Sequence, residues 1–158
     1  MPIEKQEFRR VLGHFAAGVT VLTTVGEDGC PYGLTATAFT SVSLAPPLVL
    51  VCVDKGADSY PHFQASGVFA VNFVRVDHEH LSRHFAVSGG DKFTEVAFRH
   101  GVTGAPVLAD ALGYLECRIV ETVAGGDHTI FLGQVEAADA HEGEPLLYYR
   151  GSYRRLGK

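Results

Sequence analysis

One short run of small and hydroxylated side chains, residues 33–43, has the composition of a ligand-binding strand. It reads Gly-Leu-Thr-Ala-Thr-Ala-Phe-Thr-Ser-Val-Ser. A flat polar ring can lie against such a strand, because small side chains permit close approach and backbone N–H groups and hydroxyls can bond to ring carbonyls and nitrogens. The same composition also suits a half-exposed strand in which threonine only satisfies β propensity. From this run alone, both interpretations stay open.

A lysine and a serine on either side of a predicted turn make a second candidate, for an anionic group. Lys55 follows an apolar strand, and Ser59 stands at the start of a predicted short helix. Free N–H groups and the helix dipole favour an anion at such a position, so a phosphate could bind there. A solvated turn lysine beside a helix-capping serine is the simpler alternative.

The pair Asp127-His128, which follows a Gly-Gly turn and begins a predicted strand, is the third candidate. His128 could bind a phosphate or carboxamide of a second substrate, with Asp127 fixing the imidazole tautomer. The alternative is a hydrogen-bonded histidine that only stabilises the turn.

Histidine and cysteine positions predict neither a metal site nor a disulfide framework. Of the clustered histidines His78, His80 and His84, only the last two share a helix face, and no HExxH motif or cysteine partner accompanies them. The 3 cysteines are widely spaced and lack a CxxC pair, which favours reduced thiols in a cytosol. We therefore expect no bound metal and interpret Cys52 and Cys117 as core residues.

Motifs and composition exclude several common functions. The chain lacks the GxGxxG, GxxxxGK[ST] and GxSxG signatures of dinucleotide-binding, P-loop and α/β-hydrolase sites. Its formal net charge of -5 argues against a nucleic-acid binder, which needs a basic surface. Residues 1–10 show no signal-peptide pattern, and the longest apolar stretch, residues 44–53, is too short to cross a bilayer. These features predict a cytoplasmic protein with no membrane contact.

The elements that must position these candidates are mostly strands. A helical apolar stripe covers residues 4–15, and short helices are expected from residue 58 or 59 and over residues 78–85. Strands are expected at residues 19–25, 34–43, 48–53, 68–74, 114–123, 129–136 and 146–156, with turns at 27–29 and 124–127 and a long irregular connection at 89–106. Strands without a helix between most of them favour a mainly antiparallel barrel over parallel βαβ units. With 158 residues and no linker or repeat, residues 1–158 are expected to form one domain.

Five segments, in this order and spacing, strongly resemble the short-chain flavin reductase family. They are FAAGVTVLTT, GLTATAFTSVSLAPPLVLVCVDK, FAVNFV, GGDHTIFLGQVE and PLLYYRGSYRRL. Members of this family are the reductase components of two-component flavin-dependent monooxygenases and have an FMN-binding split-barrel fold. The resemblance implies a mainly β protein, an antiparallel split β-barrel of Greek-key type with a few short peripheral helices. It also implies a homodimer that binds its flavin at the subunit interface.

The resemblance also implies which residues bind FMN or FAD and which bind NADH or NADPH. The isoalloxazine and ribityl chain would contact Thr35, Ala36, Thr37, Ala38, Phe39 and Ser41. The phosphate side of the flavin would contact Val53, Asp54, Lys55 and Ser59. The flavin's other arm would contact His84 and Phe85. The nicotinamide nucleotide would contact His128, Tyr148, Tyr149, Arg150 and Gly151. Position 37, often Asn in the family, is Thr here, which leaves the polar contact at that point open.

The activity implied is hydride transfer from NAD(P)H to flavin, with reduced flavin diffusing to a separate flavin-dependent oxygenase component. No catalytic protein side chain is expected, because the hydride passes directly between the cofactors. A vitamer oxidase or a deazaflavin-dependent reductase on the same barrel is one alternative, against which the GDH and YYRG segments argue. A non-catalytic flavin or haem carrier, or a redox sensor, is the other.

Overall fold

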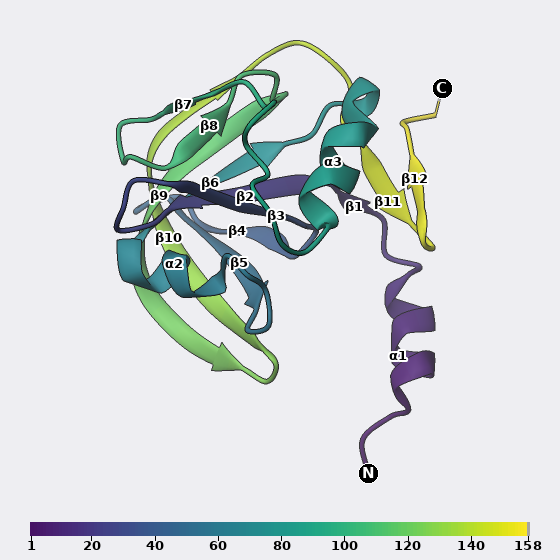
Figure 1. Ribbon diagram of the computed structural model, residues 1–158. Coiled ribbons are helices and arrows are strands. Elements are labelled where there is room, and N and C mark those ends of the chain that lie inside the picture. The colour runs from purple at the N-terminus through teal and green to yellow at the C-terminus, as the bar shows by residue number, and fades with distance from the viewer. Residues whose placement is uncertain (158) are drawn as a thin grey trace.

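A seven-stranded antiparallel sheet forms the body of the computed structural model, which describes residues 1–157 (Figure 1). In order of neighbours, its strands are β3 (Pro31–Ala36), β2 (Thr20–Val25), β6 (Val68–Phe73), β9 (Gly113–Gly125), β10 (His128–Ala140), β5 (Leu48–Asp54) and β4 (Phe39–Ser43). Alternate residues along β5 and the first half of β10 are buried, as expected for strands with one face toward a core. The expected mainly β, antiparallel architecture is confirmed.

The two strands at the ends of this order, β3 and β4, are separated in sequence by only Thr37 and Ala38. So short a link can join the two edge strands only if the sheet curls until its edges meet, because two residues span less than about 10 Å. The sheet is therefore a barrel with a seam, which we define as Thr37 and Ala38. The prediction of one continuous strand over residues 34–43 is wrong, because at the seam the chain passes from one edge strand of the sheet to the other.

Aromatic side chains fill the barrel interior and fix α2 (Tyr60–Ser66) against it. Phe63 of α2 is fully buried with Phe69 and Phe131, and its ring centroid lies 5.8 Å from that of Phe131. Gly133 lets β10 pass close to this cluster, because a Cβ there would lie 2.6 Å from the Phe69 ring. The packing of α2 in turn holds the preceding turn, residues 55–59, at the end of the barrel.

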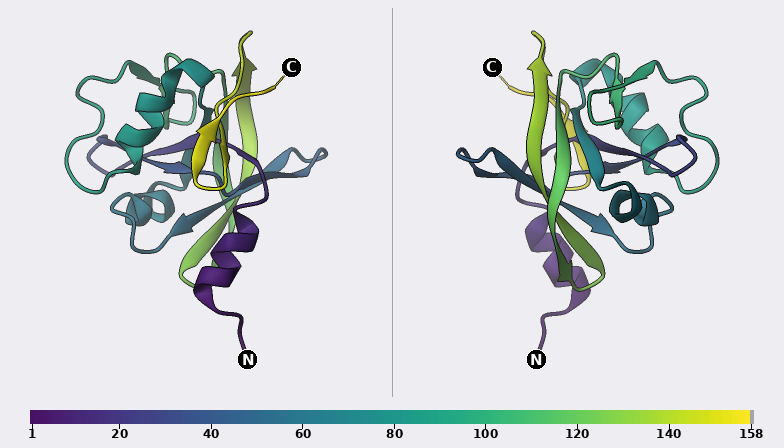
Figure 2. Two further views of the ribbon diagram at one scale, coloured as in Figure 1. Left: turned by 90° about the vertical axis from the view of Figure 1, so that its right-hand side faces the viewer. Right: turned by 90° about the vertical axis from the view of Figure 1, so that its left-hand side faces the viewer.

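β9 and β10, each of 13 residues, form a long hairpin that runs along the whole barrel (Figure 2). The turn predicted at residues 124–127 is confirmed, with Gly126 and Asp127 between the two strands. On its other side β10 pairs with β5, and this register places His128 opposite Asp54. The hairpin thus brings its turn to the end of β5, next to residues 55–59.

A second layer covers β2 and β3 and contains η1 (Val76–His78), α3 (Glu79–Ala86) and the β7 (Phe98–His100) and β8 (Pro106–Leu108) pair. Phe85 of α3 packs with Phe93 and Leu108 in a core of its own. The fully buried Asn72 ties this layer to the barrel, since its amide donates to Val21 O and accepts from the Leu108 N–H, both at 3.0 Å. The connection predicted at residues 89–106 is irregular except for β7 and the first residue of β8, two short strands that the sequence did not reveal.

α1 (Lys5–Leu12) extends away from the barrel (Figure 1). The predicted helical stripe is confirmed, but it is not buried: Phe8, Val11 and Leu12 are 52%, 52% and 54% exposed, and Phe15 is 80% exposed. None of the helices within residues 1–157 has the length and apolar character needed to span a membrane.

A three-stranded sheet of β1 (Ala17–Gly18), β11 (Leu147–Tyr149) and β12 (Ser152–Arg154) joins α1 to the C-terminal segment. The continuous strand predicted over residues 146–156 is wrong, because Arg150 (φ 50°) and Gly151 (φ 77°) form a tight hairpin. Positive φ angles at both central residues are typical of the two-residue hairpin turn whose twist matches that of the strands. Asn or Asp usually occupies its first position, so the Arg-Gly sequence here does not predict the turn. The Arg150 N–H donates to Gly13 O at 2.8 Å, which ties this hairpin to the end of α1.

Candidate functional site

A cavity of about 490 Å³ opens at the seam of the barrel, and we call it the seam cavity. This volume lies within the roughly 300–1,000 Å³ of typical ligand pockets. Its walls are the end of β3 with the seam, the end of β5 with the turn that follows, the C-terminal end of α3 and the start of the hairpin strand β10. The lining residues are 34–38, Cys52, Asp54, 56–59, 85–88, Lys92 and His128.

The seam wall presents small side chains and free backbone donors. Thr37 and Ala38 are exposed, and within residues 1–157 their N–H groups donate to no backbone carbonyl. The strand end before them is fixed on both sides: Thr20 Oγ1 donates to Ala36 O at 2.6 Å, and Thr35 Oγ1 donates to Ser82 O of α3 at 2.5 Å. The seam is therefore a rigid edge with unpaired N–H groups, which suits hydrogen-bond acceptors on a flat ligand.

The turn after β5 forms the opposite wall. Asp54 Oδ1 accepts from the Gly56 N–H at 2.8 Å, which shapes the turn. Ser59 is only 4% exposed, lines the cavity, and does not use its hydroxyl to cap α2. Lys55 is exposed and does not line the cavity; its N–H donates to Asp127 O at 3.0 Å and joins this turn to that of the β9–β10 hairpin.

Lys92 is a lining residue that the sequence did not single out. Its ammonium donates to Gly33 O and Phe85 O, both at 3.2 Å, and so bridges β3 and α3. Burial lowers the pKa of Lys92, although the nearby Asp58 opposes this shift. The one feature of the sequence near Lys92 is the Gly-Gly-Asp-Lys segment of the predicted irregular connection. Local sequence does not determine where an irregular segment contacts the barrel, so Lys92 could not be identified as a lining residue.

His128 lines the mouth of the cavity, and one of its two ring nitrogens already makes a hydrogen bond. Its Nδ1 lies 2.7 Å from Asp127 Oδ1, and this hydrogen bond lowers the pKa of Asp127. Because an ionised carboxylate can only accept, Nδ1 carries the proton of this bond. The predicted tautomer control by Asp127 is thus geometrically in place, and Nε2 is left for a ligand.

The structure brings together about half of the residues expected at the site. Thr35, Ala36, Thr37, Ala38, Asp54, Ser59, Phe85 and His128 line the seam cavity. The Val53 side chain is fully buried in the core, and Phe39, Ser41 and Lys55 lie near the cavity without lining it. Tyr148, Tyr149, Arg150 and Gly151 lie on the β11–β12 hairpin, outside the cavity lining. Contacts from these residues to flavin or nicotinamide stay predictions.

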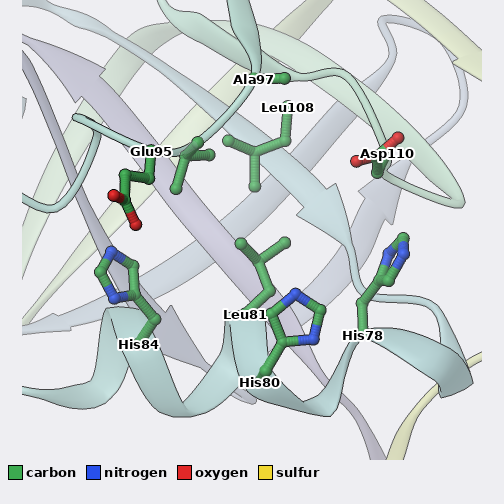
Figure 3. Close-up of a pocket in the computed structure, with 9 residues that line it drawn as sticks. His78, His80, Leu81, His84, Glu95, Ala97, Leu108 and Asp110 are labelled. Carbon is green, nitrogen blue, oxygen red and sulfur yellow. The ribbon is translucent and has the colours of Figure 1, made fainter.

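A second hollow, of about 340 Å³, lies beside α3 (Figure 3). His78, His80 and His84 border it across from Glu95 and Asp110, above an apolar floor. His84 therefore faces this hollow and not the seam cavity, and its Nε2 lies 2.6 Å from Lys92 O. In the described part of the chain, no group of three or more His, Cys, Asp or Glu side chains is arranged to hold a metal ion.

The seam cavity is equipped for binding more than for acid–base or nucleophilic chemistry. Cys52 is its only thiol, and burial raises the pKa of Cys52, which favours the unreactive thiol. Within residues 1–157 no hydrogen bond joins a serine or cysteine of the lining to His128. What the walls offer is free N–H groups, hydroxyls, one ammonium and one imidazole around a space of ligand size.

Comparison with known proteins gives a consistent set of relatives. The sequence profile of the flavin reductase like domain matches residues 12–157. The reductase component of 4-nitrophenol 4-monooxygenase/4-nitrocatechol 2-monooxygenase from Rhodococcus opacus is 45% identical, over 96% of this chain and 81% of that protein. An NADH-dependent FAD reductase from Streptomyces globisporus is 44% identical, over 98% of this chain and 87% of that protein.

Solved structures agree with these sequence relatives. The NADH:FAD oxidoreductase of Streptomyces globisporus, solved in complex with NAD and FAD fragments, superposes with a TM-score of 0.91 at 44% identity. That match covers 98% of this chain and 93% of the other. The expected split-barrel architecture is confirmed by this likeness.

Proposed function

Because the chain belongs to the flavin reductase like domain family, we propose that it is an NAD(P)H:flavin oxidoreductase. It takes NADH or NADPH, reduces FMN or FAD, and supplies the reduced flavin by diffusion to a separate flavin-dependent monooxygenase component. The relative from Rhodococcus opacus is such a reductase component, which supports this assignment. We further propose that residues 1–158 act as one domain in the cytoplasm.

The observation that carries the proposal is the seam. A flavin presents a flat ring with carbonyl and nitrogen acceptors, and the seam offers unpaired N–H groups beside alanine and threonine side chains that permit close approach. Ser59 and the turn after β5 stand at the far wall, where a phosphate would end. The residues present therefore fit the group.

Bound flavin supplies the redox chemistry, by accepting a hydride from a nicotinamide. The chain's own residues would hold the flavin in place: the seam N–H groups would donate to acceptor atoms of the ring, and such donors would stabilise negative charge there. Thr35, anchored on Ser82, keeps the seam rigid. His128 offers Nε2 at the mouth, where a second substrate would enter. No protein nucleophile is required.

Steady-state assays on the purified protein test this function. NADH or NADPH oxidation should depend on added FMN or FAD and saturate with both substrates. A non-catalytic flavin carrier would bind flavin without accelerating this oxidation above the rate with free flavin alone, and that result would refute the proposal.

Flavin should shield one cysteine from alkylation. Cys52 lines the seam cavity and is half-buried, so a bound ring would cover its thiol. With FMN at about ten times its Kd, alkylation of Cys52 by iodoacetamide should slow about tenfold, because only the free protein reacts. Peptide mass spectrometry follows each site. Cys117, whose pKa burial raises to about 12, should stay unmodified throughout as an internal reference.

Replacing His128 with alanine should raise the KM for NAD(P)H about tenfold or more. One lost hydrogen bond to a charged group is worth about 1.5–3 kcal/mol, which corresponds to at least that factor. Flavin affinity and Tm should change little, because the imidazole is at the cavity mouth and outside the core. His141→Ala, at an exposed histidine away from the cavity, is the matched control. An unchanged KM with a lowered Tm would contradict this role.

We also propose a homodimer, formed through the exposed stripe of α1. An isolated helix of eight residues with a bare apolar face is not stable alone in water, so a second copy covering Phe8, Val11, Leu12 and Phe15 explains its presence. Light scattering should give twice the chain mass, and Leu12→Glu should shift the protein toward monomer. A fully active wild-type monomer would contradict the dimer.

A further inference from the structure

A pair of hydroxyl groups joins the C-terminal hairpin to α3. The phenol oxygen of Tyr153 in β12 lies 2.6 Å from Ser82 Oγ in α3. Ser82 is fully buried, whereas Tyr153 is half-buried and packs on the core that contains Phe85. A helical serine can also bond the carbonyl four residues earlier in its own helix, so α3 does not need Tyr153 to pair this hydroxyl. What the contact fixes is the position of the hairpin against α3.

The backbone carbonyl of Ser82 makes a second link, to the wall of the seam cavity. It accepts from Thr35 Oγ1 at 2.5 Å, and Thr35 lines the cavity two residues before the seam. Because both bonds end on one residue inside a helix, the rigid helical backbone sets the distance between Tyr153 and Thr35. We call this path, from Tyr153 through Ser82 to Thr35, the Ser82 bridge.

Tyr153 also contacts the strand that we propose to meet the nicotinamide nucleotide. Tyr153 is paired with Tyr148 across β11 and β12, and their rings meet edge-on with centroids 5.4 Å apart. The guanidinium of Arg83 covers the Tyr153 ring, with Cζ 4.9 Å from its centroid. The ring is thus held between β11 and α3, and a shift of Tyr153 would also shift Tyr148.

We propose that Tyr153 is a positioning residue for hydride transfer, which fixes the β11–β12 hairpin relative to the seam through the Ser82 bridge. The proposal rests on the function assigned above, and Tyr153 itself lies outside the lining of the seam cavity. Hydride transfer depends steeply on the separation of donor and acceptor, and a misplacement of about 1 Å can cost about 100-fold in rate. Loss of the Tyr153 hydroxyl should therefore slow the transfer while leaving the binding of each cofactor intact.

Tyr153→Phe removes the hydroxyl and keeps the ring. In anaerobic stopped-flow mixing with saturating FAD and NADH, the rate constant of flavin reduction should fall about tenfold, as expected for a shift of less than about 1 Å. The Kd for FAD and the apparent Kd for NADH should stay within about twofold, and Tm should fall by no more than about 4 °C, because one neutral hydrogen bond is lost.

Tyr114→Phe is the matched control. The Tyr114 hydroxyl also makes a hydrogen bond, accepting from Arg99 Nη2 at 2.9 Å, and the Arg99 guanidinium lies over the Tyr114 ring, 5.4 Å from its centroid. Tyr114 is on β9 and outside the lining of the seam cavity. This variant should reduce FAD with the rate constant of the wild type.

Ser82→Ala tests whether the effect of Tyr153 passes through Ser82. It should slow flavin reduction about as much as Tyr153→Phe, and the double variant should be no slower than either single variant, because all three interrupt the same bridge. An unchanged rate constant in Tyr153→Phe, a loss confined to the Kd values, or effects that multiply in the double variant would overturn the proposal. A wild type that reduces FAD no faster than NADH alone reduces free FAD would instead refute the function itself.

Discussion

Replacing Ala38 with tyrosine is expected to weaken flavin binding on the order of 100-fold, or about 2.7 kcal/mol. Ala38 is one of the two seam residues and lines the seam cavity with its methyl group. A phenol ring at this point would occupy the space in which the flavin ring lies and would block the unpaired N–H groups of the seam. Fluorescence titration with FMN and FAD measures the loss for both flavins.

The folding of this variant can be assessed separately. Ala38 is exposed, so Tm should fall by no more than about 2 °C, as is usual for surface substitutions. Thr40→Tyr introduces the same ring two residues along, at an exposed position of β4 that does not line the cavity. It should bind flavin like the wild type. Equal affinities of wild type and Ala38→Tyr would remove the seam from the flavin site.

Replacing Glu116 with alanine is expected to lower the free energy of unfolding by about 3 kcal/mol. Glu116 is 1% exposed in β9, and its carboxylate accepts from Thr103 N–H at 3.0 Å, Thr103 Oγ1 at 2.7 Å and Val102 N–H at 3.3 Å. Each donor left unpaired away from water costs about 1–3 kcal/mol. Gly101 shows how tightly the turn wraps this carboxylate, because a Cβ there would overlap it.

Urea unfolding and thermal melting measure this cost, and Tm should fall by roughly 6–12 °C for a protein of this size. Glu121→Ala, at an exposed glutamate of the same strand, should change Tm by no more than about 2 °C. A wild-type Tm in Glu116→Ala would mean that the turn between β7 and β8 does not depend on the carboxylate for its hydrogen bonds.

The sequence predicted the strands of the barrel because their signal is local. Residues 48–53 are a continuous apolar run, residues 129–136 are rich in apolar and β-branched side chains, and the Gly-Gly-Asp turn defines the hairpin end. The seam was not predictable in this way. Residues 34–43 favour a strand throughout, and only distant pairing, of Thr35 with Val21 and of Ser41 with Val49, separates β3 from β4.

In the candidate site, too, residues with a local sequence signal were predicted and those that depend on distant contacts were not. Residues 35–38 and His128 were found because their types are unusual at those positions and because the chain resembles a known family. Lys92 was missed, since its role depends on carbonyls of Gly33 and Phe85, 59 and 7 residues away in sequence. His84 and Phe85 are neighbours in the sequence, yet they line different cavities beside α3, because successive helix residues point about 100° apart and Phe85 is buried in the core.

Anaerobic mixing of the protein with FAD and NADH tests most directly whether the seam is the flavin site of a nicotinamide-dependent reductase. Without oxygen, loss of the flavin's visible absorption reports reduction alone. The wild type should bleach FAD rapidly and in proportion to NADH added, whereas Ala38→Tyr at the same concentrations should bleach it on the order of 100-fold more slowly, in line with its expected affinity. Wild-type bleaching no faster than that of free FAD with NADH, or equal rates for wild type and Ala38→Tyr, would contradict the account.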